Sequence, residues 1–339
     1  MTDLRLRFLS GDDIAALRLG PDEVLGAVED GLRAHGLGRV VMPPKHHLSL
    51  EQRHHGHFNI LKGYVEQLDL AGVKVIGDYL DNHLLGLPSE LALLTLYRAD
   101  SGAPLAIMDA TELTWMRTGA VTAIGARLLA RRGSRTLGHI GARGTARYNL
   151  PYLDHLFDFD TIRVTSRRAE SRDRFAAEMT ELLGKPVIAV AGVEETVAGA
   201  DIVVDASRLA EEETLLRTEW LAPGALVMPY GAVRSTDPGL PLEASKFVVD
   251  DWEQAAASEF GQYYHVIAAG QLRREHVHAE IGEIVAGTAA GRERDDELIV
   301  FWHRGFAVSD IAIGALALRR AEQAGVGTEV VYARGLRPI

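Results

Sequence analysis

The chain has 339 residues, which is long enough for two domains, and its hydrophobic content of 47% is ordinary for a globular protein. A formal net charge of −11, with arginine pairs that are scattered, argues against a nucleic-acid partner, because phosphate binding requires clustered basic residues. The chain contains no cysteine, which excludes disulfides and cysteine-bound metals, and it lacks a signal peptide and a long apolar run, so we expect a soluble, cytoplasmic protein without membrane contact.

The first 125 or so residues are predicted to form a mixed α/β unit. Apolar residues recur at helical spacing in segment 21–35, and a loop rich in histidine and proline follows at 42–47. Strand-like runs are expected at residues 58–64, 72–76, 91–97 and 104–108.

Segment 136–146 combines a short apolar run with Gly141 and leads into a helix-like stretch, which is the order that a dinucleotide-binding turn requires. In the pattern G-x-G-x-x-G/A, Gly141 takes the first position and Ala146 the last. Arg143 occupies the middle position, and Gly144 lies one residue late. The pattern predicts the fold but leaves two interpretations of Arg143 open. Its side chain swings out to pair with a phosphate, or it fills the pyrophosphate groove and weakens or abolishes dinucleotide binding.

Strand-like and helix-like segments then alternate with short connections, which predicts an α/β fold with a doubly wound parallel sheet of Rossmann type. The expected strands are 161–165, 186–191, 201–205, 225–228 and 247–250, and the expected helices are 170–183, 194–197 and 252–260. A helix at 308–324 is expected to return to the first domain. We therefore expect a Rossmann dinucleotide-binding domain over 127–306, and a substrate-binding and dimerisation domain made of 1–126 and 307–339.

Several segments resemble motifs of the ornithine cyclodeaminase/mu-crystallin family. The matching segments are GVKVI at 72–76 with Asn82 and GLP at 86–88, Thr114 with RTGA at 117–120, GEIVAG at 282–287, GR at 291–292, and VFWHRG at 300–305 with Asp310. They follow the family's order and span most of the chain. The resemblance implies a homodimer with an NAD(P)-binding Rossmann domain, and a mixed α/β domain that carries the dimer contact and much of the substrate pocket.

Three cationic residues are candidates for binding a substrate. By the residues alone, Lys74 either faces solvent or is buried for a function, and Arg117 either forms a structural salt bridge or clamps a carboxylate. The resemblance implies that Lys74 contacts the carboxylate or imine and that Arg117 binds the carboxylate, so we expect both to be catalytic and substrate-binding residues. Lys45 stands where relatives carry an arginine, and it keeps the charge while losing the bidentate geometry.

The residues after the strand at 225–228 separate two possible reactions. The resemblance implies that ornithine cyclodeaminases place an aspartate here, beside the nicotinamide, and Ala232 occupies what we take to be its place. Alanine cannot act as a base, and Asp237 could substitute only if the loop were rearranged. We therefore expect hydride transfer to or from a C=N bond of a small amino or imino acid. A cyclodeaminase and a non-catalytic ligand-binding protein are the alternatives.

Ser166, Arg167 and Arg168 lie at the end of the second Rossmann strand, where NAD-binding proteins usually carry an acidic residue. A hydroxyl and guanidinium groups suit a 2′-phosphate, so NADP(H) is favoured and NAD(H) is possible; a solvated helix cap is the alternative interpretation. The expected cofactor-binding residues are Thr118, Gly141, Ala142, Arg143, Gly144, Thr145, Ala146, Ser166, Arg167, Arg168, Ala206, Ser207, Met228, Tyr230 and Gly231.

The histidine groups at 46–47, 54–57 and 276–278 are not expected to hold a metal, because no cysteine or acidic motif at ligand spacing accompanies them. The resemblance implies that these loops cover the mouth of the active site, where one histidine can touch the substrate. His303 stands where the resemblance implies a serine close to the nicotinamide. It is either a substrate-binding residue or a histidine packed in the core.

Overall fold

A computed structural model describes residues 2–336, which divide into two compact units. Unit 1 joins the N-terminal part up to Arg117 with the C-terminal part from Phe306, and unit 2 is Thr118–Gly305. The first boundary falls inside the long helix α4 (Thr111–Leu129), upstream of the boundary expected after residue 126. The roles assigned to the two domains stay predictions. None of the described helices has the length and apolar character needed to span a membrane.

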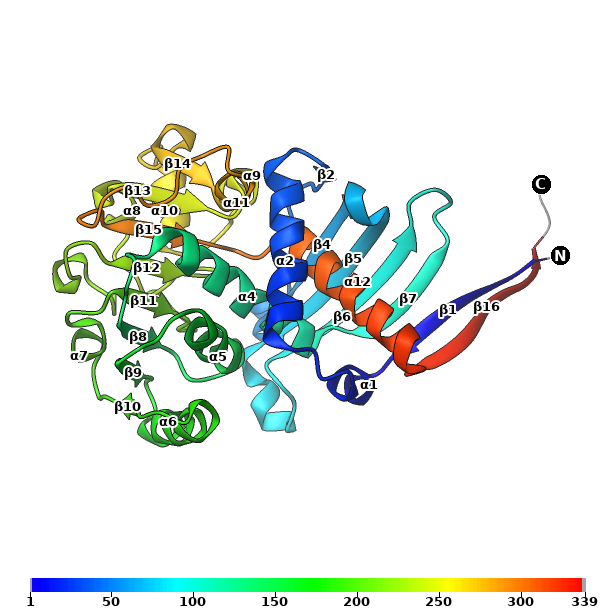
Figure 1. Cartoon of the computed structure of the whole chain (residues 1–339), viewed down its shortest axis with the longest axis horizontal. Coiled ribbons are helices and arrows are strands. Elements are labelled where there is room, and N and C mark those ends of the chain that lie inside the picture. The colour runs from blue at the N-terminus through cyan, green and yellow to red at the C-terminus, as the bar shows by residue number, and fades with distance from the viewer. Residues whose placement is uncertain (1, 337–339) are drawn as a thin grey trace. The chain divides into compact units, whose positions relative to one another are not determined.

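Unit 1 is built on a sheet with the strand order β16-β1-β7-β6-β5-β4-β2, and β3 pairs with β4 (Figure 1). The strands are β1 (Thr2–Leu9), β2 (Val40–Val41), β3 (His46–Ser49), β4 (Gly56–Val65), β5 (Leu70–Tyr79), β6 (Glu90–Arg98), β7 (Pro104–Asp109) and β16 (Thr328–Leu336). Strands β4 to β7 are successive and antiparallel, as short connections dictate. The four strands expected in this region are confirmed.

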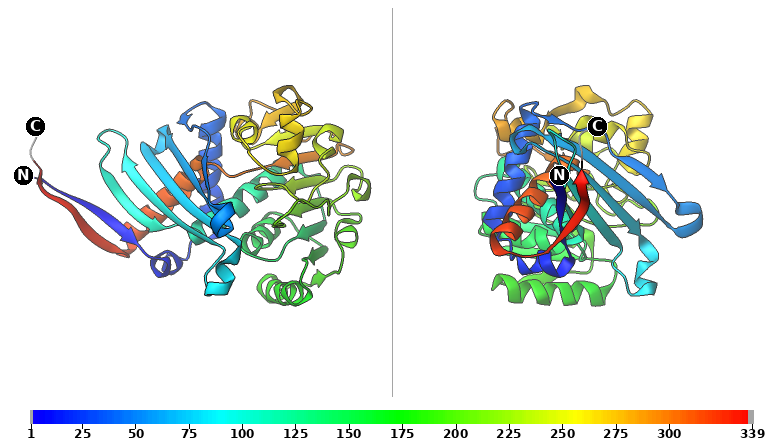
Figure 2. Two further views of the ribbon diagram at one scale, coloured as in Figure 1. Left: turned by 180° about the vertical axis from the view of Figure 1, so that it is seen from behind. Right: turned by 90° about the vertical axis from the view of Figure 1, so that its right-hand side faces the viewer.

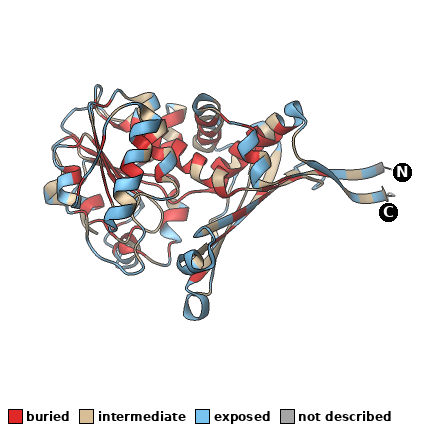
Figure 3. Ribbon diagram, turned by 90° about the horizontal axis from the view of Figure 1, so that it is seen from below, coloured by how far each residue is buried: buried red, intermediate tan, exposed pale blue. Residues whose placement is uncertain are grey.

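Two features of unit 1 differ from the expectation. Residues 46–49 form β3, which pairs antiparallel with β4, so part of the predicted histidine-rich loop is a strand. Strands β1 and β16 form a long two-stranded ribbon that the sequence did not predict (Figure 2). This ribbon is mostly exposed or half-buried (Figure 3).

The helices of unit 1 are α1 (Gly11–Ala16), α2 (Pro21–Gly36), α3 (Glu51–His54), the first turns of α4, and α12 (Ala307–Ala324). Helix α12 packs against α2 and against β4, β5 and β6, so the expected C-terminal helix does return to the first domain. A Cβ atom on Gly72 would lie only 2.7 Å from Cγ1 of Ile311. Glycine at this position therefore lets α12 approach β5 closely.

Unit 2 contains the strands β8 (Thr136–Ile140), β9 (Thr161–Thr165), β10 (Val187–Ala189), β11 (Ile202–Asp205), β12 (Leu226–Pro229), β13 (Lys246–Val249), β14 (Val277–Glu280) and β15 (Ile299–Trp302). Their order is β10-β9-β8-β11-β12-β15-β13-β14, and every pairing is parallel. The doubly wound parallel sheet is thereby confirmed.

The helices of unit 2, besides the rest of α4, are α5 (Ala146–Leu156), α6 (Ala169–Leu183), α7 (Val193–Val197), α8 (Leu240–Glu243), α9 (Trp252–Ala256), α10 (Gln262–Ala268) and α11 (Ile281–Ala286). The expectation of one helix over 252–260 was wrong: α9 ends at Ala256, and α10 begins after Gly261. Gly261 has a φ of +98°, which favours glycine and interrupts the helical path.

The direction of chain winding in unit 2 reverses between β8 and β11. The chain moves from β8 through β9 to β10 on one side, and β11 then pairs with β8 on the other side. The carboxyl ends of β8 and β11, at Ile140 and Asp205, flank this switch point. In open α/β sheets, ligands bind at such a point.

Candidate active site

Lys74 is buried in the interior of unit 1. In the sheet it pairs with Leu61 of β4 and Leu94 of β6, both of which are also buried. Only 1% of Lys74 is exposed, so the interpretation of a solvent-facing lysine is wrong. A lysine with this burial needs compensating partners, because removing an ammonium group from water is costly.

Those partners come from two helices. The Nζ atom of Lys74 donates hydrogen bonds to Oδ1 of Asp310 at 2.7 Å and to Oγ1 of Thr114 at 3.2 Å. The Nε atom of Arg117 donates to the same Oδ1 of Asp310 at 2.8 Å. Asp310 is 2% exposed, and among the described residues its Oδ2 has no hydrogen-bond partner. A single carboxylate oxygen thus holds both cations.

Both cations keep donors that the described part of the protein does not use. An ammonium group has three N–H donors and a guanidinium group has five. Within residues 2–336, Lys74 makes the two hydrogen bonds named above and Arg117 makes the single bond from Nε. One N–H of Lys74 and the terminal Nη groups of Arg117 are therefore available to an anion, and a guanidinium fork suits a carboxylate.

Burial lowers the pKa of Lys74 from 10.5 to about 8, and the nearby Arg117 lowers it further in the same direction, while Asp310 opposes both effects. At neutral pH the side chain is still mostly protonated. The positive charge that a carboxylate ligand requires is therefore present, but it titrates much closer to neutrality than an ordinary lysine.

Lys45 immediately precedes β3. The first pair of that ladder is His46 with Ile60, so continuing the register places Lys45 opposite Leu61, whose partner on the other side is Lys74. Lys45 is half-buried. If the register extended by one residue beyond the end of β3, Lys45 would share the face of Lys74; its role stays a prediction.

The glycine turn of unit 2 is held close to its neighbouring strands. Gly141 has a φ of +108°, and a Cβ atom there would lie 2.6 Å from the carbonyl oxygen of Ala206, so only glycine fits. Its N–H donates to the carbonyl of Thr165 at 2.8 Å. Thr145 precedes α5, and Arg143 is exposed. Both interpretations of Arg143 stay predictions.

A buried histidine in β8, the strand that leads into the glycine turn, supports this turn. His139, in β8, is 0% exposed; its Nδ1 lies 2.9 Å from the carbonyl oxygen of Gly141, and its Nε2 lies 3.1 Å from Nδ2 of Asn149. Burial lowers the pKa of His139 to about 4, so the ring is neutral near pH 7. With Nδ1 protonated, the ring donates to Gly141 and accepts from Asn149. Sequence reasoning missed this residue, although a histidine inside an apolar strand was a signal.

The other expected cofactor-binding residues also belong to unit 2. Arg167 and Arg168 are exposed and have no carboxylate partner among the described residues, and Oγ of Ser166 donates to the carbonyl of Arg168 at 3.2 Å. The remaining positions are Ala142 and Gly144 in the turn, the buried Ala146, Thr118 and Met228, and the half-buried Ala206, Ser207, Tyr230 and Gly231.

Sequence reasoning also missed Asp205, at the carboxyl end of β11. Its Oδ1 accepts a hydrogen bond from the backbone N–H of Ser207 at 3.0 Å. Its Oδ2 accepts from Oγ of Ser235 at 2.6 Å and from Oγ1 of Thr236 at 2.7 Å. This buried carboxylate fixes the loop that carries Ala206 and Ser207 at the switch point.

His303 is packed in the core of unit 2. It is 1% exposed, and its ring lies 5.2 Å from the rings of both Tyr230 and Phe301. Its Nε2 lies 3.0 Å from Oγ1 of Thr122, which donates to the carbonyl of Thr118. The packing fits the core interpretation, and a substrate contact by His303 stays a prediction.

The loop after β12 contains no carboxylate at the position expected for a cyclodeaminase base. Ala232 is half-buried. Asp237 accepts hydrogen bonds from Oγ1 of Thr218 and from the backbone N–H of Gly239, both at 2.9 Å. These hydrogen bonds hold Asp237 in its loop, and the exclusion of Asp237 as a base stays a prediction.

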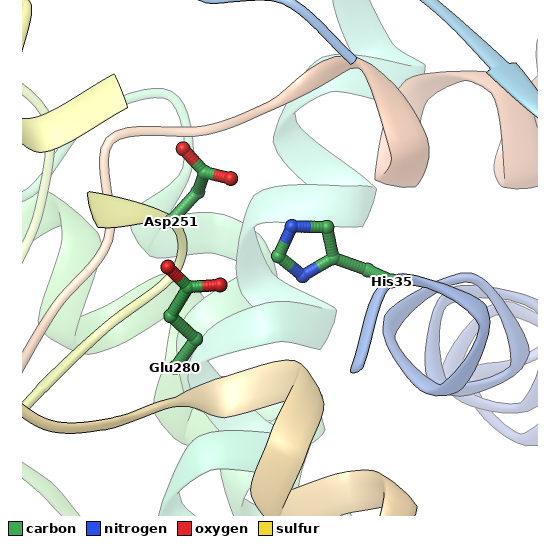
Figure 4. Close-up of side chains that lie close together, drawn as sticks. All are labelled: His35, Asp251 and Glu280. Atoms are coloured by element: carbon green, nitrogen blue, oxygen red, sulfur yellow. The ribbon is translucent and has the colours of Figure 1, made fainter. Parts of the chain in front are cut away.

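Two further carboxylates of unit 2, Asp251 and Glu280, cap the start of α9 (Figure 4). Oδ1 of Asp251 accepts from the N–H of Gln254 at 2.7 Å, and Oε1 of Glu280 accepts from the N–H of Trp252 at 3.0 Å. His35, also labelled there, belongs to unit 1, where its ring lies 5.4 Å from that of Phe306. The capping bonds give both carboxylates a structural role.

A doubly wound parallel sheet with a glycine turn at its switch point defines an α/β protein of the dinucleotide-binding class. In the same chain, the other unit carries the buried lysine and arginine. The sequence pattern of the Ornithine cyclodeaminase/mu-crystallin family matches residues 8–324, and the chain belongs to this family.

The chain is 30% identical over 329 residues to an alanine dehydrogenase of Archaeoglobus fulgidus, covering 96% of this chain and 98% of that protein. The structure of the Thermococcus litoralis Delta(1)-pyrroline-2-carboxylate reductase, in complex with NADH and L-proline, matches with a TM-score of 0.89 and 31% identity, over 96% of this chain and all (100%) of that one. An archaeal alanine dehydrogenase dimer with bound NAD matches with a TM-score of 0.88 and 30% identity, over 97% and 100% of the two chains.

Proposed function

We propose that this protein is an NAD(P)H-dependent imine reductase or amino-acid dehydrogenase, which transfers hydride to or from the C=N carbon of a small amino or imino acid. The observation that carries the proposal is the buried cluster of Lys74, Arg117 and Asp310, with cationic donors left for a carboxylate. The names of the similar proteins, an alanine dehydrogenase and a pyrroline-2-carboxylate reductase, support this class of reaction.

In this proposal the substrate carboxylate belongs to unit 1 and the dinucleotide to unit 2. The Nη groups of Arg117 grip the carboxylate, and the third N–H of Lys74 adds a second charged donor. Gly141 lets the backbone approach a dinucleotide, and His139 and Asp205 fix the two loops at the switch point. The bound nicotinamide supplies or accepts the hydride, and the imine nitrogen gains or loses one proton.

For the cofactor we propose a preference for NADP(H), with NAD(H) as the possible alternative. The end of β9 carries Arg167 and Arg168, and no acidic residue stands there to bind the ribose hydroxyls of NAD. Both guanidinium groups are exposed and lack a carboxylate partner among the described residues, which suits a 2′-phosphate.

We also propose that the protein is a homodimer. On the face of the unit 1 sheet opposite to Lys74, Val75 pairs with Leu93, and Leu91 follows on the same face. These three side chains are 38%, 53% and 42% exposed. An exposed apolar sheet face of this kind marks an interface, and the similar archaeal alanine dehydrogenase is described as a dimer.

One assay tests the reaction against its alternatives. The purified protein is mixed with NADPH or NADH and, in separate reactions, with pyruvate plus ammonia or with a cyclic imino acid. A further reaction contains ornithine and a catalytic amount of NAD. Net loss of the reduced cofactor's absorbance supports the reductase. Ammonia release from ornithine with catalytic NAD and no net redox change would identify a cyclodeaminase. Absence of dinucleotide binding in a thermal-shift titration would leave a ligand-binding protein.

A further inference from the structure

We infer that Asp310 is a positioning residue that fixes Lys74 and Arg117 and sets the charge of the site, so that the site takes a substrate with a single carboxylate. This inference rests on the proposed function and narrows its substrate class.

The contacts of Asp310 are directed at the two cations. Its Oδ1 accepts from Lys74 at 2.7 Å and from Arg117 at 2.8 Å, and its Oδ2 bonds to no described residue. Buried carboxylates normally satisfy both oxygens, so an aspartate that served the fold alone would be expected to bond elsewhere as well. Asp310 also lies in the first turn of the 18-residue helix α12, where the helix dipole stabilises a negative charge.

The arrangement requires close packing of α12 on β5. Gly72 permits that approach, since a side chain there would meet Ile311, the residue after Asp310. Two cations that share one buried oxygen repel each other, and the carboxylate between them offsets this repulsion. Asp310 therefore determines where the remaining donors of both cations lie.

The three buried groups together carry one positive charge. A buried net charge is unfavourable unless a counter-ion arrives, and a ligand with one carboxylate supplies it. A dicarboxylate of similar size brings a second negative charge that the buried cluster does not compensate. Lys45 and Glu90, which also lie in unit 1, are only half-buried, so solvent screens their charges.

Propionate and malonate form a matched pair of probes, since both have three carbons and they differ in one carboxylate. Their dissociation constants are measured by calorimetry in the presence of NADPH, which needs no turnover. We expect the wild type to bind propionate at least about tenfold more tightly than malonate, because an uncompensated like charge costs binding energy.

In the Asp310→Asn variant the two cations lose the carboxylate that positions them, so we expect propionate binding to weaken. The cluster also gains a second positive charge, so we expect the ratio of malonate affinity to propionate affinity to rise at least about tenfold. Asp310→Glu keeps the charge and should keep the wild-type preference. Ser309→Ala is the matched control, because it removes the hydrogen bond from Ser309 to the carbonyl of Phe306 at the start of α12 without touching either cation. It should leave the preference unchanged.

Equal binding of the two probes by the wild type, or binding of neither, would overturn the inference. An unchanged preference in a folded Asp310→Asn variant would do so as well. If the Asp310→Asn variant does not fold, the inference is still tested by two measurements. These are the preference of the wild type for propionate over malonate and the retention of that preference in the Asp310→Glu variant. Absence of imine reduction by a wild type that retains the preference would instead overturn the proposed reaction, so the two failures are distinguishable.

Discussion

The Nζ atom of Lys74 and the Oδ1 atom of Asp310 lie 2.7 Å apart, although 236 positions separate the two residues in the chain. Strand β5 supplies the lysine and the C-terminal helix α12 supplies the aspartate, within one unit. The cluster of Lys74, Arg117 and Asp310 therefore exists only because the last helix packs back onto the N-terminal sheet.

Replacing Lys74 with alanine should lower kcat/KM for the imino acid at least about 100-fold, since a charged donor to the substrate is lost. Cofactor affinity should stay nearly unchanged, because the residues expected to bind the dinucleotide lie in unit 2. Steady-state kinetics and a cofactor titration measure the two effects. Lys185→Ala is the control, because Lys185 of unit 2 pairs with Asp154 at 2.8 Å and does not contact the cluster. Unchanged turnover of the Lys74→Ala variant would remove Lys74 from the active site.

The activity should depend on the protonation of Lys74. Its pKa is lowered to about 8, so the side chain loses its proton, and with it the charge that attracts a carboxylate, as the pH rises through 8. We expect kcat/KM to fall above about pH 8, because the pH dependence of kcat/KM follows the pKa values of the free enzyme. A bound carboxylate raises the lysine pKa, so kcat should persist to higher pH. A kcat/KM profile that stays level to pH 10 would contradict the role assigned to this lysine.

Changing Arg168 to aspartate should lower the ratio of kcat/KM for NADPH to that for NADH at least about tenfold, because a charge-assisted bond to the 2′-phosphate is replaced by repulsion. The ratio is measured with a fixed imino acid. Arg172→Ala is a suitable control, since Arg172 in α6 pairs with Asp173 at 3.1 Å. A wild type that uses NADH in preference to NADPH would show that the cofactor proposal is wrong.

Replacing His139 with phenylalanine should weaken dinucleotide binding by about tenfold, since the carbonyl of Gly141 loses a buried hydrogen-bond donor and the turn is no longer fixed. Propionate binding should not change, because the cations lie in unit 1. Fluorescence titration with NADPH measures the first constant and calorimetry the second. Equal loss of both affinities would indicate general destabilisation. Unchanged cofactor affinity would show that His139 does not support the glycine turn.

A charge on the apolar face of the unit 1 sheet should disrupt the proposed dimer. Leu93 is 53% exposed, and Leu93→Glu would place a carboxylate within the interface, where it has no partner. Light scattering after size-exclusion chromatography should report a dimer for the wild type and a monomer for the variant. Glu329→Gln, an exposed change on β16, should remain dimeric. A monomeric wild type would refute the dimer.

Local sequence patterns were sufficient to predict those strands, helices and turns whose conformation depends mainly on their own residues. Segment 161–165 was predicted as a strand and is β9, and the helix expected at 308–324 is α12. The glycine turn after β8 was recognisable because a positive φ at Gly141 demands glycine. The pairing of β1 with β16 was missed, since it joins the two ends of the chain. Residues 4–8 of β1 alternate between apolar and basic side chains, but β16 has no such alternation to indicate a partner.

The sequence by itself determined the class of fold, the position of the dinucleotide turn and the candidates Lys74 and Arg117, because periodicity, turn residues and motifs are local properties. Only the tertiary structure decided that Lys74 is buried and that Asp310 joins it to Arg117. Burial depends on which face of β5 is covered, and α12 covers it from more than 200 residues further along the chain. A contact of that range leaves no periodic signal in the sequence, so the charge balance of the site becomes visible only in the folded protein.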